Sequence, residues 1–518
     1  MTATAEAAAS RPHDEAAPSG RPAVLLLGWT AVIMSAGVCL AAVSLPSATE
    51  DLGLSPFLRS ASASAPSLAI AASAIALGVA ADRLGRRRLL MWAYALAAGA
   101  SLAVIVVPSG VVYLAGNALA GAAYGVFLSA TYAYLTAVVP RASVGRAIGL
   151  WGMSSIVIGT VASIGGSLLA DADWRWLYAI VPAMCAVAAV LTPRLLPPMP
   201  RATSGPVDWP GIVLVGLGVV LLITGLLAVA SDPASLVAWA LIAAGVAALA
   251  AWVAAELRSR APAFPLRLFR SRLFLAAVLS GLFVNGAYAA PIISLSDYLQ
   301  YEKKGSVLVA TLGLQPFYLI GALAWYVAGR QLSAGRSPRS VVALGALLAA
   351  AGFVALLPLE QGSAYWVLLP GSLLVGYGTN AALTGQSQVY LDAAPADAYG
   401  AVTASKLTVG QLGYSVGMIL TTLVLSGFTA RGILSGLTAA GESSQEASAT
   451  LSALNAALLS GQPPALQDLS EVMRVTSAAF TAAFRVRMVV GAVVMGVTAA
   501  GTWLLMREPA RAPGGGRE

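Results

Sequence analysis

Charge and histidine are scarce in this chain. Of its 518 residues, 58% are hydrophobic and only 10% are charged, whereas a soluble domain carries about 25% charged residues. His13 is the single histidine and stands in the N-terminal tail, so histidine-based catalysis or metal binding within a membrane is excluded. A GxxxxGK[ST] phosphate-binding loop is also missing, so direct use of ATP is not supported.

Cysteine and buried acid are equally rare. Cys39 and Cys185 both fall in apolar stretches, so we expect free thiols and no disulfide framework. Acidic residues are missing from the middle of every apolar stretch, and Asp297, Glu256 and Asp392 stand at stretch ends, where we expect them to be solvated or interfacial. Lys406 lies inside a stretch, where it either snorkels to the interface or faces a cavity as a functional cation.

Long apolar runs dominate what is present. A membrane-spanning helix needs about 20 apolar residues, and such runs recur from residue 23 to residue 506. The sequence therefore predicts an all-α polytopic membrane protein. We place fourteen spans in a six, two, six pattern, at about 23–46, 60–81, 88–107, 110–139, 143–170, 173–195, 208–230, 234–256, 270–298, 305–330, 338–358, 363–391, 397–428 and 479–506.

The spans and the linkers between them predict a domain order. It consists of a disordered cytoplasmic tail, a six-helix bundle, a two-helix insertion, a second six-helix bundle and a short cytoplasmic tail, at 1–22, 23–200, 201–260, 261–508 and 509–518. The second bundle contains an outer loop, 430–478, which we expect to form an amphipathic helix on the membrane surface or to be a floppy spacer. An even number of spans puts both tails on the same side. The bias of lysine and arginine toward one set of loops makes that side the cytoplasm.

A charged turn separates the second and third spans. Residues 78–90 read GVAADRLGRRRLL, in which Gly85 suits a tight reversal with positive φ. A basic cytoplasmic loop is one interpretation. The stretch also resembles the G-x-x-x-D-R-x-G-R-R loop of the major facilitator superfamily. That resemblance implies a latch that holds one state of the transport cycle, formed by Gly78, Asp82, Arg83, Gly85, Arg86 and Arg87.

Further segments resemble the fourteen-span drug:proton antiporters of that superfamily. They include VGRA at 144–147, WRW at 174–176 and PLRLFRSRLF at 265–274, and Gly335-Arg336 repeats the core of the charged turn in the second half. The resemblance implies the major facilitator fold, with the substrate bound between two six-helix bundles near the midplane.

Three departures from that family bear on proton coupling. Gly37 replaces an acid of the first span, Asn117 replaces an arginine of the fourth, and Val161-Ala162 replaces the Gly-Pro pair of the fifth. Because no other acid lies mid-span, we expect substrate-induced proton flux to be weak or absent.

Polar residues follow helical spacing on the spans that line the cavity in the resembled fold. They predict a neutral, amide- and aromatic-rich substrate wall, suited to a bulky amphiphile, and interhelical hydrogen bonding is the alternative for each residue. The proposed wall consists of Ser35, Asn117, Tyr124, Thr131, Asn285, Tyr288, Tyr377, Asn380, Thr384 and Gln388.

The expected function is secondary transport that exports hydrophobic or amphipathic compounds, as in multidrug efflux and antibiotic resistance. A lipid or envelope-precursor carrier without standard proton coupling is one alternative, and a transport-inactive scaffold or sensor is another. We expect no enzymatic activity, cofactor, metal or nucleic-acid partner. We expect contact with membrane lipids, a monomer, and residence in a bacterial cytoplasmic membrane.

Overall fold

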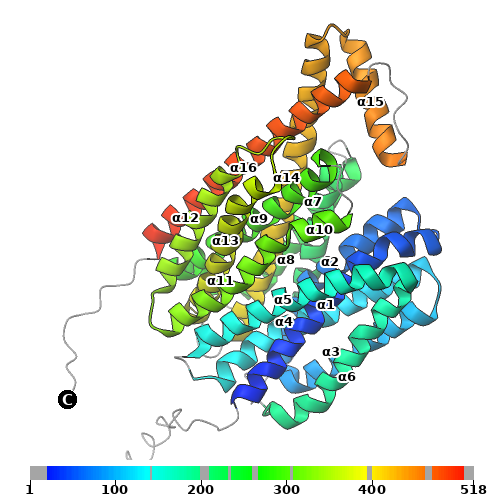
Figure 1. The fold of residues 1–518 in the computed structure, drawn as a ribbon. Coiled ribbons are helices and arrows are strands. Elements are labelled where there is room, and N and C mark those ends of the chain that lie inside the picture. Colours follow the sequence, from blue (N-terminus) through cyan, green and yellow to red (C-terminus); the bar gives the residue numbers. More distant parts are fainter. Residues whose placement is uncertain are drawn as a thin grey trace, which may run out of the picture. The chain divides into compact units, whose positions relative to one another are not determined.

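The computed structural model is helical wherever it describes the chain. It describes residues 20–140, 143–198, 209–231, 235–258, 266–303, 307–393, 399–460 and 469–506. Within these ranges the backbone forms helices joined by short turns, and no strand occurs (Figure 1). The prediction of an all-helical fold is therefore confirmed. The predicted disordered tail lies outside the described residues up to residue 19, and the first helix already begins at Gly20.

The first of two compact units contains the first six helices. It comprises residues 1–207 together with 325–336 and 396–404. Helix α4 packs on α1, α2 and α3, and α1 packs on α5 and α6, so α4 is buried along most of its length. The helices of unit 1 are α1 (Gly20–Asp51), α2 (Pro56–Leu84), α3 (Arg86–Val106), α4 (Gly110–Val138), α5 (Val144–Asp173), the short η3 (Trp174–Trp176) and α6 (Leu177–Leu195).

The second unit comprises residues 208–324, 337–395 and 405–518. Its core is formed by α9, α11, α12, α13 and α16, where apolar side chains such as Val284, Phe317 and Phe353 are fully buried. The helices that lie wholly or partly in unit 2 are α7 (Trp209–Ser231), α8 (Leu236–Arg258), η4 (Leu266–Arg270), α9 (Arg272–Asp297), η5 (Tyr298–Glu302), α10 (Val307–Gly313), α11 (Gln315–Ser333), α12 (Pro338–Ala355), α13 (Tyr365–Ala393), α14 (Tyr399–Ala439), α15 (Ser444–Ser460) and α16 (Leu469–Leu505).

Helices α7 and α8 form a pair through small residues. A Cβ added to Gly245 would lie 2.6 Å from the backbone nitrogen of Leu222, and one added to Gly225 would lie 2.7 Å from that of Ile242. Only glycine allows the two backbones to approach this closely, which is the usual way for helices to pack in lipid.

The predicted spans all fall on helices. The span predicted at 305–330 is divided, because α10 ends at Gly313 and α11 begins at Gln315. Among the described residues, ten helices are long and apolar enough to cross a membrane, and α7 contributes a shorter apolar run, Val213–Leu226. The protein is therefore a multi-pass membrane protein, and the number of fourteen crossings stays a prediction.

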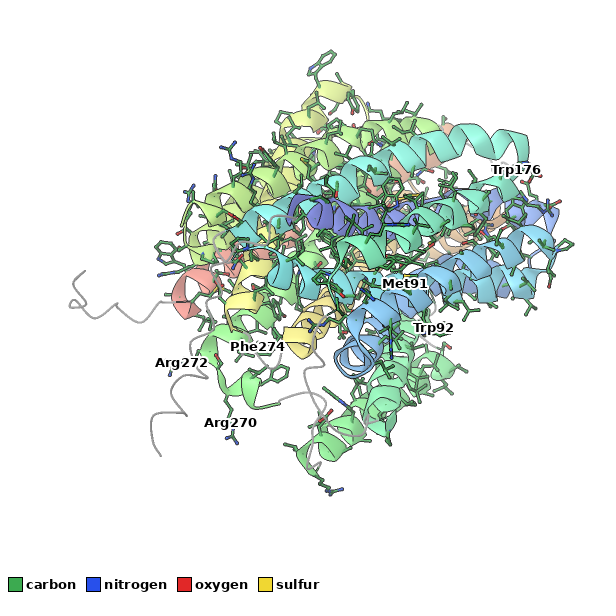
Figure 2. The ribbon with its side chains drawn as sticks, turned by 90° about the horizontal axis from the view of Figure 1, so that it is seen from below. Met91, Trp92, Trp176, Arg270, Arg272 and Phe274 are labelled. Atoms are coloured by element: carbon green, nitrogen blue, oxygen red, sulfur yellow. The ribbon has the colours of Figure 1, made fainter. Side chains whose placement is uncertain are left out.

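The outer surfaces of the helices carry large apolar side chains. In unit 1, Trp92 is 73% exposed and Trp176 is 68% exposed (Figure 2). In unit 2, by contrast, Phe274 is fully buried close to the exposed Arg270 and Arg272 (Figure 2). A water-soluble protein rarely exposes so much apolar surface, whereas contact with lipid explains it.

Two glycines make equivalent turns in the two halves of the chain. Gly85 joins α2 to α3 with φ of 95°, and Gly335 joins α11 to α12 with φ of 86°. Residues with a Cβ rarely adopt a positive φ, so both positions favour glycine. The turn predicted at Gly85 is confirmed. The corresponding glycine of the second half, Gly335, also has a positive φ.

The C-terminal part of α14, the helix α15 and the N-terminal part of α16 extend from the rest of unit 2 (Figure 1). The 41 residues of α14 rise about 61 Å, roughly twice the hydrocarbon thickness of a bilayer. Helix α15 packs on α14 and α16 around the buried residues Leu437, Ala447 and Val475. The segment 430–478 therefore contains a helix, as predicted, but this helix packs against its neighbours through its own small core.

A capping box begins α15. The Ser443 hydroxyl accepts a bond from the Glu446 backbone N–H, while the Glu446 carboxylate accepts bonds from the Ser443 N–H and hydroxyl. The hydroxyl bond and the backbone bond both lower the pKa of Glu446.

Candidate functional site

The predicted substrate residues on α4 lie inside unit 1. Asn117 is buried, donates to the Tyr113 carbonyl at 2.9 Å and accepts a bond from the Tyr178 hydroxyl at 3.1 Å. Ser44 lies 3.0 Å from the Tyr113 hydroxyl and 3.3 Å from that of Tyr178. The amide that replaces the family's arginine therefore belongs to a neutral hydrogen-bonded network joining α1, α4 and α6.

Tyr124 occupies the place beside Gly37. A Cβ at Gly37 would lie 2.5 Å from Tyr124 Cζ and closer still to the hydroxyl. Tyr124 is buried, and its ring centroid lies 5.9 Å from that of Phe127. The space that an acidic side chain would need at position 37 is thus filled by the hydroxyl end of a tyrosine, which accounts physically for the glycine.

The two other predicted residues of unit 1 differ in exposure. Thr131 is fully buried, and its hydroxyl lies 2.8 Å from that of Thr30 on α1. Ser35 is half-buried on α1, beside Gly159 of α5. Ser35 is therefore the most accessible of the four predicted substrate residues of unit 1.

An ionic and aromatic cluster closes one end of the same network. Arg175 pairs with Asp51 at 2.5 Å, and its guanidinium carbon lies 4.8 Å from the centre of the Trp174 ring. The Trp174 indole donates to Asp51, and its ring meets Tyr113 edge to face. The WRW segment thus ties the start of α6 to the end of α1.

The two predicted substrate residues of α9 in unit 2 are half-buried. Asn285 donates to the Gly281 carbonyl at 2.7 Å and lies beside Gly410 of α14. The ring of Tyr288 is 5.5 Å from Phe317 and 6.5 Å from Tyr414, centre to centre. These two predicted residues form a partly accessible amide and aromatic pair.

The polar residues of α13 span a range of burial. Asn380 and Thr384 are buried and bond along their own helix, whereas Tyr377 and Gln388 are half-buried, and Gln388 donates to the exposed Asp392. Sequence reasoning missed Gln386, which is fully buried and donates to the Ala277 carbonyl of α9. Its signal was the polar run TGQSQ, residues 384–388.

The charged turn is described in part. Gly85, Arg86 and Arg87 are half-buried, and Arg87 reaches the Leu196 carbonyl at 3.5 Å. The side chains of the other predicted latch residues, Gly78, Asp82 and Arg83, lie outside the described part of the structure.

A glycine seam that the sequence analysis missed joins α5 to the end of α11 within unit 1. A Cβ at Gly149 would lie 2.5 Å from the Trp325 carbonyl oxygen, and one at Gly329 would lie 2.5 Å from that of Gly145. The Arg146 N–H also donates to the Ser333 hydroxyl at 2.8 Å. Glycines 145, 149 and 152 recur at helical spacing, which was the available signal.

The acids at the helix ends correct one expectation. Asp392 is exposed, as expected, but Glu256 is only 3% exposed, and Asp297 pairs with Arg487 at 3.3 Å. Sequence reasoning missed Arg487, although it lies inside the span predicted at 479–506. Lys406 is half-buried on α14, and its role as a cavity charge stays a prediction.

No cluster of three histidine, cysteine or acidic side chains that could hold a metal occurs among the described residues. Both cysteines are free, as predicted. The arrangement offers neutral amides, hydroxyls and aromatic faces inside helical units, which suits binding of a small molecule rather than covalent chemistry.

Comparison with known proteins agrees with this arrangement. The chain is 26% identical over 401 residues to the multidrug efflux pump LfrA of Mycolicibacterium smegmatis, covering 76% of this chain and 79% of that protein. It is 29% identical over 418 residues to the puromycin resistance protein pur8 of Streptomyces alboniger, covering 75% and 78%. The crystal structure of the human organic anion transporter MFSD10 (TETRAN) matches with a TM-score of 0.61 at 15% identity, covering 92% of this chain and all of that one.

Residues 25–418 match the sequence profile of the Major Facilitator Superfamily. This match covers more than half of the chain, and the helical fold agrees with it. The protein is therefore a transporter and not an enzyme, and the chain belongs to the Major Facilitator Superfamily.

Proposed function

We propose that this protein exports hydrophobic or amphipathic small molecules across a bacterial cytoplasmic membrane by alternating access. The observation that carries the proposal is the neutral character of the accessible polar residues. Ser35 in unit 1 and Asn285, Tyr288 and Tyr377 in unit 2 are half-buried and carry hydroxyl, amide or aromatic groups without fixed charge. Such groups suit a bulky amphiphile, whereas a small ion or a phosphate would demand a fixed charge.

The names of two relatives support the proposed direction and suggest probes to test. LfrA is named as a multidrug efflux pump and pur8 as a puromycin resistance protein. We extend both to this chain as a proposal. Puromycin is therefore one probe, and ethidium is chosen as the second because it is a bulky amphipathic dye. Binding contacts are assigned first to the half-buried residues, because Asn117, Thr131 and Thr384 are buried and hydrogen-bonded within their own units.

The charged turn is proposed to act as the conformational latch, with both termini in the cytoplasm and the chain acting as a monomer. The positive φ at Gly85 supports a tight reversal between α2 and α3, with the arginines of the turn at one membrane face. The domain order of two six-helix bundles around a two-helix insertion belongs to the same proposal.

Expression in a bacterium that lacks its own efflux pumps tests this function. We expect raised resistance to puromycin and lower accumulation of ethidium, and both effects should weaken in Asp82→Asn but persist in Arg88→Gln, a neighbouring change at an exposed position. Membrane levels of each variant are measured by immunoblot. If the wild-type protein changes neither probe nor any member of a broad toxicity panel, the export proposal fails and a lipid carrier or scaffold is favoured.

A further inference from the structure

A buried arginine faces an acid across unit 2. Arg487 of α16 is 2% exposed, and its Nη1 lies 3.3 Å from Asp297 Oδ2 at the end of α9. The two residues stand 190 positions apart in the chain. The Asp297 side chain remains 19% exposed, whereas the guanidinium of Arg487 is buried.

The pair is only partly satisfied. Arg487 Nε and Nη2 are buried and have no hydrogen-bond partner among the described residues. Its guanidinium carbon lies 5.8 Å from the ring centre of Phe480 and 5.9 Å from that of Phe484, so its surroundings are apolar. A guanidinium can hold a carboxylate through two parallel bonds, and here it forms one. The interaction is therefore one that a conformational change can strengthen or break.

The other charges at this end of unit 2 have partners of their own. Lys303, after η5, donates to the carbonyls of Gln361 and Ser363 and lies over the Tyr298 ring. Glu360, before α13, pairs with Arg485 of α16 at 2.7 Å. Among the described charges at this end, the fixed positive charge that acts directly on Asp297 is therefore that of Arg487.

Two positions of unit 1 that the resemblance links to proton coupling carry no titratable side chain. Gly37 has no acidic side chain, and Tyr124 fills the space that one would occupy. Asn117 is a neutral amide bonded to Tyr178. Neither position can change charge during a transport cycle.

We propose that Asp297 carries the coupling proton of this transporter, with Arg487 as its counter-charge, and this proposal replaces the expectation of weak or absent proton flux drawn from the sequence. The inference rests on the proposed export function and deepens it. In the described state the ionised carboxylate compensates the guanidinium. When Asp297 takes a proton, Arg487 is left as an uncompensated charge in an apolar cluster, which is strongly unfavourable.

A state of the cycle that gives Arg487 water or another acceptor therefore binds the proton more tightly. Different proton affinities in two conformations are what couples a proton gradient to substrate movement. The proton binds to a carboxylate oxygen of Asp297 and leaves from the same atom, so no further reactant is required.

Purified protein in liposomes tests the proposal, with ethidium and puromycin as probes and an internal pH dye reporting proton flux. Counterflow exchanges substrate for substrate and needs no proton, whereas accumulation against a gradient does. In Asp297→Asn we expect gradient-driven accumulation to fall by about tenfold or more, and substrate-induced proton flux to vanish, while counterflow persists. Glu360→Gln, a neutralised acid at the same end, should leave all three readouts at the wild-type level.

The double variant Asp297→Asn with Arg487→Gln is the control for misfolding. Both partners are then neutral, so no buried charge is left uncompensated. This double variant should also retain counterflow and lose accumulation. The inference is overturned if the wild-type protein exchanges substrate without proton flux, if Asp297→Asn stays coupled, or if both variants lose counterflow together with accumulation. Absence of counterflow in the wild-type protein instead overturns the export function itself, and the inference with it.

Discussion

The contact between Gly37 and Tyr124 predicts a strong energetic coupling between α1 and α4. An alanine at position 37 would bring its Cβ to 2.5 Å from Tyr124 Cζ, and the tyrosine ring is buried and held by Phe127. Overpacking of this kind costs about 1–3 kcal/mol. A glycine-to-alanine change inside a helix gains up to about 1 kcal/mol where space is free, so the net loss is smaller than the steric term.

Gly99→Ala is the matched control. Gly99 lies on α3, another helix of the same unit, and a Cβ added there would meet nothing within 4 Å. We expect Gly37→Ala to unfold at a lower temperature in detergent than Gly99→Ala. The difference should be about 1–3 kcal/mol, or about 2–4 °C for each kcal/mol. Tyr124→Leu should lower the stability by itself, because it leaves a cavity, but should relieve the clash in the double variant.

A double-mutant cycle over Gly37→Ala and Tyr124→Leu therefore measures the coupling energy between the two positions directly. The coupling energy should reach at least about 1 kcal/mol, with the double variant more stable than the sum of the single changes predicts. A coupling energy within about 0.3 kcal/mol of zero would show that the tyrosine does not exclude a side chain at position 37. The same experiment extends to Gly37→Asp, which should insert and fold only when Tyr124 is reduced in size.

Three other predictions concern binding, topology and pH. Asn117→Leu should lower the unfolding temperature, because it removes one buried acceptor of the Tyr178 hydroxyl at a cost of about 1–3 kcal/mol. Asn285→Leu should mainly weaken puromycin binding, by roughly five- to a hundredfold. The reverse pattern, measured on the same purified variants, would exchange the two roles. Topology is tested with single-cysteine variants in a background that lacks Cys39 and Cys185. The exposed Ala449 changed to cysteine should react with an impermeant thiol reagent in intact cells, whereas the exposed Ala334 changed to cysteine should react only after the inner face is opened. The opposite labelling would show that the orientation is inverted. Since the folded-state pKa of Glu446 is lowered, its cap should stabilise α15 fully above the unfolded pKa of about 4.3 and lose this effect as the pH falls through the folded value. The protection of the α15 amides from hydrogen exchange, taken relative to the intrinsic exchange rate at each pH, should fall over that range in the wild type and stay constant in Glu446→Gln.

Much of the fold could be predicted from the sequence, because a helix that crosses a lipid bilayer needs a long apolar run. A helix that satisfies its own backbone and presents apolar side chains over about 20 residues leaves a long run in the sequence. The run at 88–107 corresponds to α3 and that at 338–358 to α12, within a few residues. The divided helix at 305–330 escaped prediction, because both α10 and α11 are apolar and read as one run. The available signal was Gly313 before the break and Pro316 just after it, a pattern typical of one helix ending and another beginning.

The candidate site was harder to predict because helical spacing states which residues share a face, not what that face meets. Asn117, Tyr124 and Thr131 do share one stripe of α4, but the stripe packs against α1 and α6. On α9 the same type of residue, Asn285, remains half-buried. Only the packing of neighbouring helices separates these two outcomes.

The sequence by itself determined the membrane class, the helical fold and the glycine turns at Gly85 and Gly335, because composition and local backbone preference act over a few neighbouring residues. The tertiary structure alone decided that Tyr124 fills the place beside Gly37, that Asn117 bonds to Tyr178, and that Arg487 meets Asp297. These partners stand 61 to 190 positions apart. Their contacts depend on which helices pack together, and no local pattern along the chain contains that information.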